Sequence, residues 1–243
     1  LLAAAMVMAV GIAALTMSLS TVASLHRAQD SYYEQYRFPQ VFTHLKRAPN
    51  SLAARIAEIP GLARAQTRIA VDVNLDVPGL AEPAVGRLVS IPGAPPFGLS
   101  ELYIRRGRFP EPGRAGEVIA SEAFAEAHNM QPGASFHAII NGKLQELQIV
   151  GIALSPEYVY QIRPGDLFPD DKRFGVFWML YTELAPAFDL DGAFNDVAAI
   201  MTPSAVEADV LKRLDDLTEV YGGTGAYGRR DQTSHRYISD EIE

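Results

Sequence analysis

The residues that could carry chemistry gather near the C-terminal end of the chain. Asp231, Ser234 and His235 supply the three side-chain types of a hydrolytic triad, in which a histidine takes the proton of a serine nucleophile and a carboxylate orients the histidine. A serine nucleophile of this kind needs a scaffold such as the G-x-S-x-G elbow, and no G-x-S-x-G occurs in the sequence. The cluster therefore favours a polar linker, and a membrane-anchored hydrolase stays as the alternative.

The segment from Gly223 to Gly228 reads G-T-G-A-Y-G and matches the pattern G-x-G-x-x-G. In dinucleotide-binding proteins this pattern follows a strand and opens a helix, so that the phosphates meet the helix N-terminus. Here it follows the end of a predicted helix, and no Walker A lysine motif accompanies it. We therefore predict a tightly turning connector and no bound nucleotide cofactor.

Metal and thiol chemistry are also disfavoured. Asp189 and Asp191 open a pattern like a calcium loop, but position 12 of that loop would be Ile200, which offers no ligand oxygen. The five histidines lack the spacing of metal ligands. The chain has no cysteine, which excludes disulfides, thiolate nucleophiles and Cys-ligated metals. The sequence predicts neither a metal nor a cofactor, and a protein that is not an enzyme.

The distribution of charge is uneven. The 243 residues include 21 Lys and Arg and 29 Asp and Glu, and none of these lies in the first 25 positions. The net charge of −8 argues against a nucleic-acid partner, which would require a basic face. The hydrophobic content of 48% is too high for a disordered chain. The charged remainder is long enough for one large or two small domains.

The charge-free segment from Leu1 to Leu25 favours a transmembrane helix. At about 1.5 Å per residue, it is long enough to cross roughly 30 Å of hydrocarbon. A secretory signal peptide ending near Ala23 and a helix buried in a core are the alternatives. Because the chain starts at Leu, we expect the true N-terminus to lie upstream.

A stalk should continue this helix and end near Phe38, because Pro39 cannot extend a regular helix. Tyr32, Tyr33 and Tyr36 lie on the stalk. Tyrosine suits a membrane interface because one edge of its ring is apolar and the other is wet. They are candidate membrane-interface residues, and the alternative is that they pack on the globular domain.

The remaining elements follow from periodicity and turn residues. Alternating apolar residues predict one strand over 65–77, in which Arg68 faces solvent, and Asn141-Gly142 predicts a type I′ hairpin. Thr202-Pro203 predicts the start of a helix that Gly222 ends. The other predicted strands and helices cover 52–59 (helix), 84–91, 117–120, 121–128 (helix), 135–140, 143–154, 174–181, 182–188 (helical turn) and 196–201. We expect an α+β fold with a β-rich insert.

Aromatic residues concentrate between positions 158 and 178. Because Tyr and Trp bury a large area with few torsions, they are common at contact surfaces. The candidate surface for a partner or cargo consists of Tyr158, Tyr160, Phe168, Phe174 and Trp178. The alternative for Trp178 is core packing.

The layout resembles the first span and periplasmic core domain of MacB/FtsX-type ABC-transporter permeases. The resemblance covers nearly the full chain, and the order of its short motifs is more specific than any one of them. These motifs are Ile59-Pro60-Gly61-Leu62-Ala63, Gly107-Arg108-Phe109-Pro110, Gly116-Glu117-Val118-Ile119, Pro132-Gly133, Leu147-Gln148-Ile149-Val150-Gly151-Ile152 and the tail from Tyr221 to Arg236.

The resemblance implies four parts: a transmembrane and stalk helix over 1–38, a porter-like α/β lobe from 39–91 and 191–222, a β-rich sabre-like lobe over 92–190, and a connector over 223–243 that returns to the membrane. It also implies the bacterial inner membrane, with the domain in the periplasm or another extracytoplasmic space. The implied partners are a cytoplasmic ABC ATPase subunit, a second permease copy or half, a periplasmic adaptor or lipoprotein, and membrane lipid. A single-span sensor or adhesion ectodomain is a further alternative.

Overall fold

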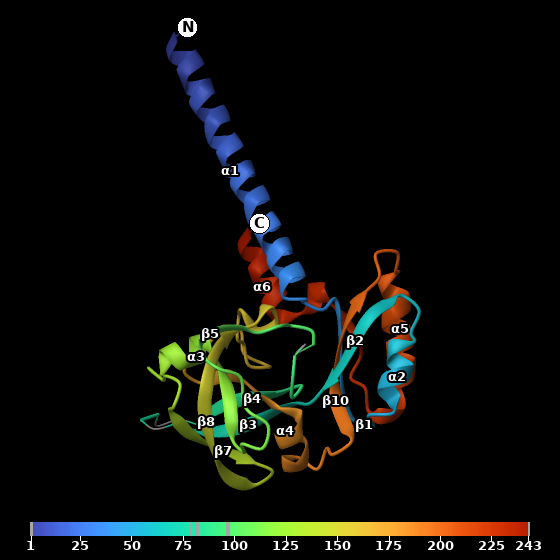
Figure 1. Cartoon of the computed structure of the whole chain (residues 1–243). Helices are drawn as coiled ribbons and strands as arrows, with labels where there is room; N and C mark the ends of the chain where they lie inside the picture. Colours follow the sequence, from blue (N-terminus) through green and yellow to red (C-terminus); the bar gives the residue numbers. More distant parts are fainter. Residues whose placement is uncertain (1, 78, 81–82, 96–97, 243) are drawn as a thin grey trace.

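A long helix projects from a body built on two sheets (Figure 1). The computed structural model describes residues 2–77, 79–80, 83–95 and 98–242. Helix α1 (Leu2–Gln35) ends three residues before Phe38, as the position of Pro39 predicts. Within the described part of the chain, no helix reaches the length and hydropathy that a membrane crossing requires. The predicted span is therefore not confirmed and stays a prediction.

The smaller sheet has four antiparallel strands in the order β11-β1-β10-β2. Helices α2 and α5 cover one of its faces, and the core between them contains Ile56, Val197, Val210 and Leu214. Strand β1 was not among the predicted elements. The elements are β1 (Val41–Pro49), α2 (Leu52–Ala57), β2 (Leu62–Arg68), β10 (Ala193–Met201), α5 (Glu207–Thr218), η2 (Glu219–Tyr221) and β11 (Tyr227–Gly228).

The larger sheet has seven strands in the order β5-β8-β6-β9-β4-β3-β7, and β7 also pairs with β8. This extra pairing closes six of the strands into a ring, whose core includes Leu88, Phe136, Ile149 and Phe177. Closing a sheet on itself removes exposed edges. The elements are β3 (Ala70–Asp76), β4 (Ala84–Ile91), β5 (Tyr103–Gly107), β6 (Glu117–Ser121), α3 (Glu122–Ala127), β7 (Ser135–Ile140), β8 (Lys143–Leu154), η1 (Pro156–Tyr158), β9 (Phe174–Leu180) and α4 (Tyr181–Ala187).

The chain passes from the smaller sheet to the larger one at Ile69. Its backbone N–H donates to Ser90 Oγ at 2.8 Å, and its carbonyl accepts from the Ser90 N–H at 2.8 Å. The single strand predicted over 65–77 is therefore wrong, because β2 and β3 belong to different sheets. For the same reason β3 and β4 lie outside the smaller sheet, although the predicted lobe boundary at 91 places them with it.

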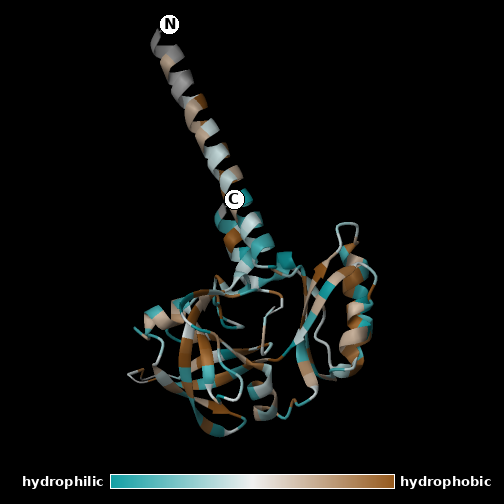
Figure 2. Ribbon diagram, viewed as in Figure 1, coloured by the Kyte–Doolittle hydropathy of each residue, from teal (hydrophilic) through white to brown (hydrophobic). Residues whose placement is uncertain are grey.

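Two other predicted features of the C-terminal half differ from the structure. The helix expected to start at Thr202-Pro203 starts at Glu207, and Val206 precedes it. The segment predicted as a connector contains β11, η3 (Arg229–Asp231) and α6 (Thr233–Ile242). Helix α6 lies beside the foot of α1, so both ends of the chain leave the body on the same side (Figure 1). Figure 2 shows that the foot of α1 is hydrophilic and that apolar residues line the strands.

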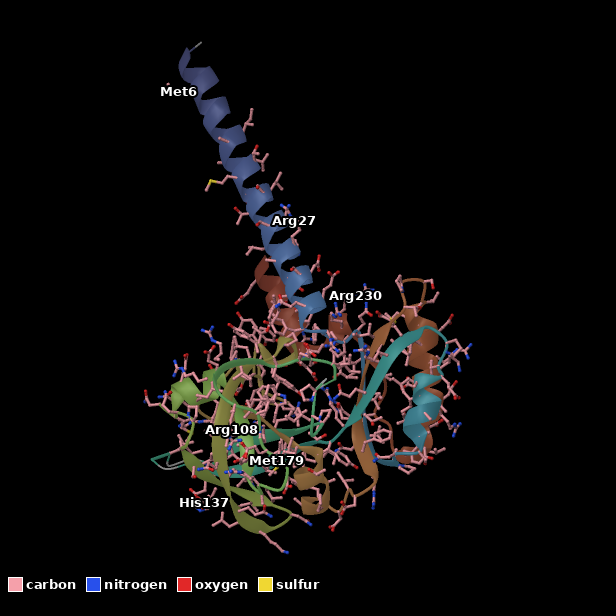
Figure 3. The ribbon with its side chains drawn as sticks, in the orientation of Figure 1. Met6, Arg27, Arg108, His137, Met179 and Arg230 are labelled. Carbon is pink, nitrogen blue, oxygen red and sulfur yellow. The ribbon has the colours of Figure 1, made fainter. Side chains whose placement is uncertain are left out.

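A glycine-rich cluster stands at the outer edge of the larger sheet, and it unites several motifs of the family resemblance. Gly107 has φ +78°, and a Cβ there would stand 2.2 Å from the Val150 carbonyl oxygen. A Cβ on Gly151 would stand 2.4 Å from the Arg108 carbonyl oxygen. Arg108 donates two hydrogen bonds to the Glu117 carboxylate, at 2.8 and 2.6 Å. These motifs therefore build a structural corner, far from Arg230 at the foot of α1 (Figure 3).

Candidate functional site

The two sheets and the two chain ends meet around a group of polar side chains, four of them buried and one partly exposed, which we call the junction. It consists of His44, Arg68, Glu157, Asp196 and Gln232. His44 comes from β1, Arg68 ends β2, Asp196 lies in β10, Glu157 belongs to η1, and Gln232 immediately precedes α6. The junction therefore joins the smaller sheet, the segment after the last strand of the β7–β8 hairpin, and the C-terminal helix.

Arg68 is the centre of the junction and is buried. Its Nη1 and Nη2 donate to the Glu157 carboxylate at 2.7 and 2.5 Å, and its Nε donates to Asp196 Oδ1. Ser100 Oγ donates to Glu157 Oε2 at 2.8 Å. The Nδ1 of His44 stands 2.5 Å from Asp196 Oδ2. Arg68 and the two carboxylates are thus paired inside the protein, with His44 at the partly exposed edge, and pairing is the condition under which buried charges are tolerated.

The electrostatics favour the charged forms of three members of the junction. Burial alone would raise the pKa of Asp196, but the charges of Arg68 and His44 hold that pKa below its ordinary value. Burial would lower the pKa of Arg68, but Asp196 and Glu157 raise it well above its ordinary value. The charge of Asp196, together with its hydrogen bond, raises the pKa of His44. Arg68 and Asp196 therefore stay charged near neutral pH, and His44 holds its proton more tightly than an ordinary histidine.

The two chain ends are bonded to the junction and to each other. Gln232 Nε2 donates to the Glu157 carbonyl oxygen at 2.7 Å, and Ser234 Oγ accepts from the Tyr160 N–H at 3.0 Å. Tyr33 Oη and His235 Nδ1 stand 3.0 Å apart, which links α1 to α6. A displacement of either helix would therefore act on the segment that carries Glu157.

Arg229 ties the end of α1 to the start of the C-terminal segment. Its guanidinium donates to the carbonyl oxygens of Phe38 and Pro39 at 2.5 and 2.8 Å. It also lies over the rings of Tyr33 and Phe38, at 5.1 and 4.9 Å from their centroids. Charged hydrogen bonds and cation–π contacts reinforce each other in a partly buried setting. The foot of α1 is thus clamped rather than freely hinged.

The triad candidates do not assemble in this arrangement. Ser234 is buried at the start of α6 and its Oγ accepts from the Tyr160 backbone, while His235 Nδ1 meets Tyr33 and Nε2 lies 3.5 Å from Ser239 Oγ. Ser234 and His235 lie on a helix rather than on the predicted linker. Among the described residues, no three His, Asp or Glu side chains gather as a metal site would need.

The aromatic residues predicted as one contact surface occupy different environments. Phe174 and Trp178 are buried in the core of the larger sheet, so neither ring is exposed on the outer surface, and the core alternative describes Trp178. Tyr158 packs edge-on against Trp178 with ring centroids 6.1 Å apart. Tyr160 is half-buried beside Tyr237, and Phe168 is exposed. A contact role for Tyr160 and Phe168 stays a prediction.

The three tyrosines predicted for the membrane interface pack on the body. Tyr33 is buried against Phe38, with ring centroids 4.6 Å apart, and Tyr32 lies against the same cluster. The ring of Tyr36 meets that of Tyr103 at 6.0 Å. The packing alternative describes these contacts, and a role at a membrane interface stays a prediction for the exposed edges of Tyr32 and Tyr36.

The junction is not among the features that the sequence predicts. The alternating pattern predicts Arg68 on the solvent side of a strand, and the structure buries it. A signal was available at Asp196, which is a charged residue inside the apolar stretch from Ala193 to Met201. An unpaired carboxylate would not be tolerated there, so its presence implies a buried cation. The sequence does not identify which arginine supplies it.

Comparisons with known proteins concern the fold. No protein-family model and no curated protein matches the sequence. One similar solved structure is the extracellular domain of the noncanonic ABC-type transporter YknZ from Gram-positive bacteria, with 11% identity and a TM-score of 0.48 over 78% of this chain and 98% of that one. A second is the periplasmic region of MacB from Actinobacillus actinomycetemcomitans, with 10% identity and a TM-score of 0.47 over 86% of this chain and 95% of that one. A third is a domain of a permease protein from Porphyromonas gingivalis, with 12% identity and a TM-score of 0.44 over 86% of this chain and 97% of that one.

All three are domains of the kind that the sequence resembles. At these identities and TM-scores they assign neither an activity nor a partner to this chain.

Proposed function

We propose that this chain is the first span and extracytoplasmic domain of an ABC-transporter permease in a bacterial inner membrane. In this role it passes motion between the membrane and a partner or cargo outside it, such as a lipoprotein, lipid, peptide or drug. It would not be an enzyme, and ATP would be hydrolysed by a separate cytoplasmic ATPase subunit. The order of the sequence motifs supports this proposal.

The single observation that carries the proposal is that α1 contacts α6 and that the residue before α6 is bonded to the junction. The two helices leave the body on the same side, where two spans of one permease would enter the membrane (Figure 1). They contact each other through Tyr33 and His235, and Gln232 connects α6 to Glu157. A relative movement of two spans would therefore reach both sheets through a few buried polar contacts.

The exposed surface of α1 also supports a membrane role. Large apolar side chains along this helix have no cover from the body: Met6, Ile12, Leu15, Met17 and Leu19 are each more than 60% exposed. Exposed apolar side chains of this kind favour a partner that is itself apolar, such as lipid or neighbouring helices. We infer that lipid and a second permease copy surround α1.

The first experiment tests the assembly. The full-length protein that contains this chain, carrying an affinity tag, should co-purify from membranes with an ABC ATPase encoded beside it. Recovery of the protein without any ATPase, under conditions that preserve other membrane complexes, would overturn the proposal.

The second experiment tests the mechanical role. The chain has no cysteine, so spin labels can be placed at Val206→Cys, at the start of helix α5 that covers the smaller sheet, and at Leu144→Cys in strand β8 of the larger sheet, both of which are exposed. In the assembled transporter, ATP should change the distance between the labels. Gln232→Ala with Ser234→Ala should strongly reduce this change, because it removes the bonds that these two residues make to the 157–160 segment.

The matched control is Thr233→Ala, an exposed neighbour of the same two residues. It should leave the ATP-dependent change intact. An unchanged distance in the unmodified transporter would reject the mechanical role even if the ATPase co-purifies.

A further inference from the structure

A cavity of about 390 Å³ lies beside the junction, and α6 forms one of its walls. Its other walls come from β1, β4, the start of β9, β11 and the segment from Glu157 to Leu167. Both sheets and the C-terminal helix therefore contribute to one space. Its volume falls in the range of about 300–1,000 Å³ that is typical of small-molecule sites.

Four cationic side chains line this cavity, and they come from four different parts of the chain. They are His44, Arg87, Arg163 and Arg236. Arg87 donates to Asp72 through Nε and Nη2, and Arg163 meets Asp166 through the same two atoms. A guanidinium has five N–H donors, so the Nη1 edge of each arginine remains for another acceptor. Arg236 is exposed on α6, and no ion pair among the described residues involves it.

The carboxylates that line the cavity are already paired with arginines. Both oxygens of Glu157 accept from Arg68, and one also accepts from Ser100. Both oxygens of Asp166 face Arg163. The available polar groups of the cavity are therefore mainly donors, which favours a ligand that carries negative charge.

Aromatic rings supply most of the apolar lining. Those that line the space are Tyr158, Tyr160, Phe174, Tyr227 and Tyr237. The Arg87 guanidinium lies over the Phe174 ring, 5.9 Å from its centroid, so cationic and aromatic surface adjoin each other. Rings of this kind bury an apolar or aromatic body at a small cost in conformational entropy.

We propose that this cavity binds a small organic carboxylate with an aromatic or alkyl body. The carboxylate is held by the arginines, the body lies among the tyrosines, and the bound molecule joins α6 to both sheets. The inference goes beyond a permease role, because it requires only the cavity and its lining.

The probe is 4-phenylbutyrate, and 4-phenylbutanol and 4-phenylbutylamine are the neutral and cationic compounds of matching shape. Trp178 is the only tryptophan and its ring touches Tyr158, a residue of the cavity wall, so its fluorescence reports occupancy. Isothermal titration calorimetry on the purified full chain gives the affinity independently. Phenylbutyrate should produce a saturable change, the alcohol should bind about tenfold more weakly, and the amine should not bind.

Variants locate the site. Arg236→Gln should weaken phenylbutyrate binding about two- to fivefold, the range for an exposed cation, and combining it with Arg163→Gln should weaken it about tenfold. Arg236→Lys should restore most of the affinity that Arg236→Gln loses. The control is Arg213→Gln, an exposed arginine of α5 away from the cavity, which should leave the affinity unchanged.

Three results would overturn the proposal. They are the absence of saturable phenylbutyrate binding, equal binding of all three compounds, and an equal effect of the Arg213 and Arg236 substitutions. Circular dichroism of each variant separates lost binding from lost folding. None of these results bears on co-purification with an ATPase, so this inference and the proposed function can fail independently.

Discussion

Two arginine–glutamate pairs of nearly the same geometry lie in different parts of this molecule. Arg68 and Glu157 meet in the junction with side chains 5% and 6% exposed, and Arg108 and Glu117 meet at the outer edge of the larger sheet with side chains 41% and 4% exposed. The first pair joins residues 89 positions apart, and the second joins residues nine positions apart. Burial and sequence separation, rather than the pair itself, decide how much of the fold depends on each.

The largest effect should follow from Arg68→Met. This change leaves Glu157 and Asp196 buried without their main cation, and breaking a buried charge network typically costs about 3–5 kcal/mol. Urea denaturation of the purified chain, followed by circular dichroism, measures the loss in the free energy of unfolding. A loss below about 1 kcal/mol would mean that water reaches both carboxylates.

The Arg108–Glu117 pair depends on a close contact between the backbones of Gly151 and Arg108. The substitution Gly151→Ala tests this dependence. A Cβ at this position would stand 2.4 Å from the Arg108 carbonyl oxygen, so the backbone that places Arg108 must move. Overpacking of this kind costs about 1–3 kcal/mol. Gly93→Ala is the control, because a Cβ there meets nothing within 4 Å, and it should leave the urea midpoint nearly unchanged.

Arg108→Gln should cost less, about 1 kcal/mol, because solvent reaches the arginine and screens the pair. In the variant, Glu117 would still accept the hydrogen bond from the Glu111 N–H, which is 2.9 Å long in the structure. The hydrogen bonds from Arg108 lower the pKa of Glu117, so the advantage of the wild type over the variant is present above the ordinary glutamate pKa of about 4.5. It is lost as pH falls through the lowered pKa. Urea midpoints of both proteins between pH 3 and pH 7 test this, and a pH-independent difference would contradict it.

The contrast between the two pairs also explains what the sequence could predict. The β7–β8 hairpin was predicted correctly because Asn141 and Gly142 adopt the positive φ angles, 47° and 75°, that a type I′ turn requires. That signal is local. Helices α2 and α3 and strands β4 and β6 follow from equally local patterns.

The junction could not be predicted in the same way. The alternation from Ala65 to Val77 continues through Ile69, so nothing in it marks the change of sheet. Arg68 is buried because Glu157 and Asp196 arrive from far along the chain, and periodicity contains no such information. Helix α6 was read as a connector for a similar reason, since its contacts are with α1 and the segment after β8.

The smallest loss of stability should follow from a substitution of His44, the partly exposed member of the junction, in contrast to the buried Arg68. His44 meets Asp196, but 42% of its side chain is exposed, so His44→Gln should cost less than about 1 kcal/mol. Asp196 raises the pKa of His44, so the folded state holds this proton more tightly than the unfolded state. The stabilisation is therefore fully present below the ordinary histidine pKa of about 6.5 and is lost as pH rises through the raised pKa. Urea midpoints of wild type and variant should differ at pH 6 and converge at alkaline pH. If the difference instead grew with pH, Asp196 would be interacting with neutral His44, and the charged part of the junction would end at Arg68.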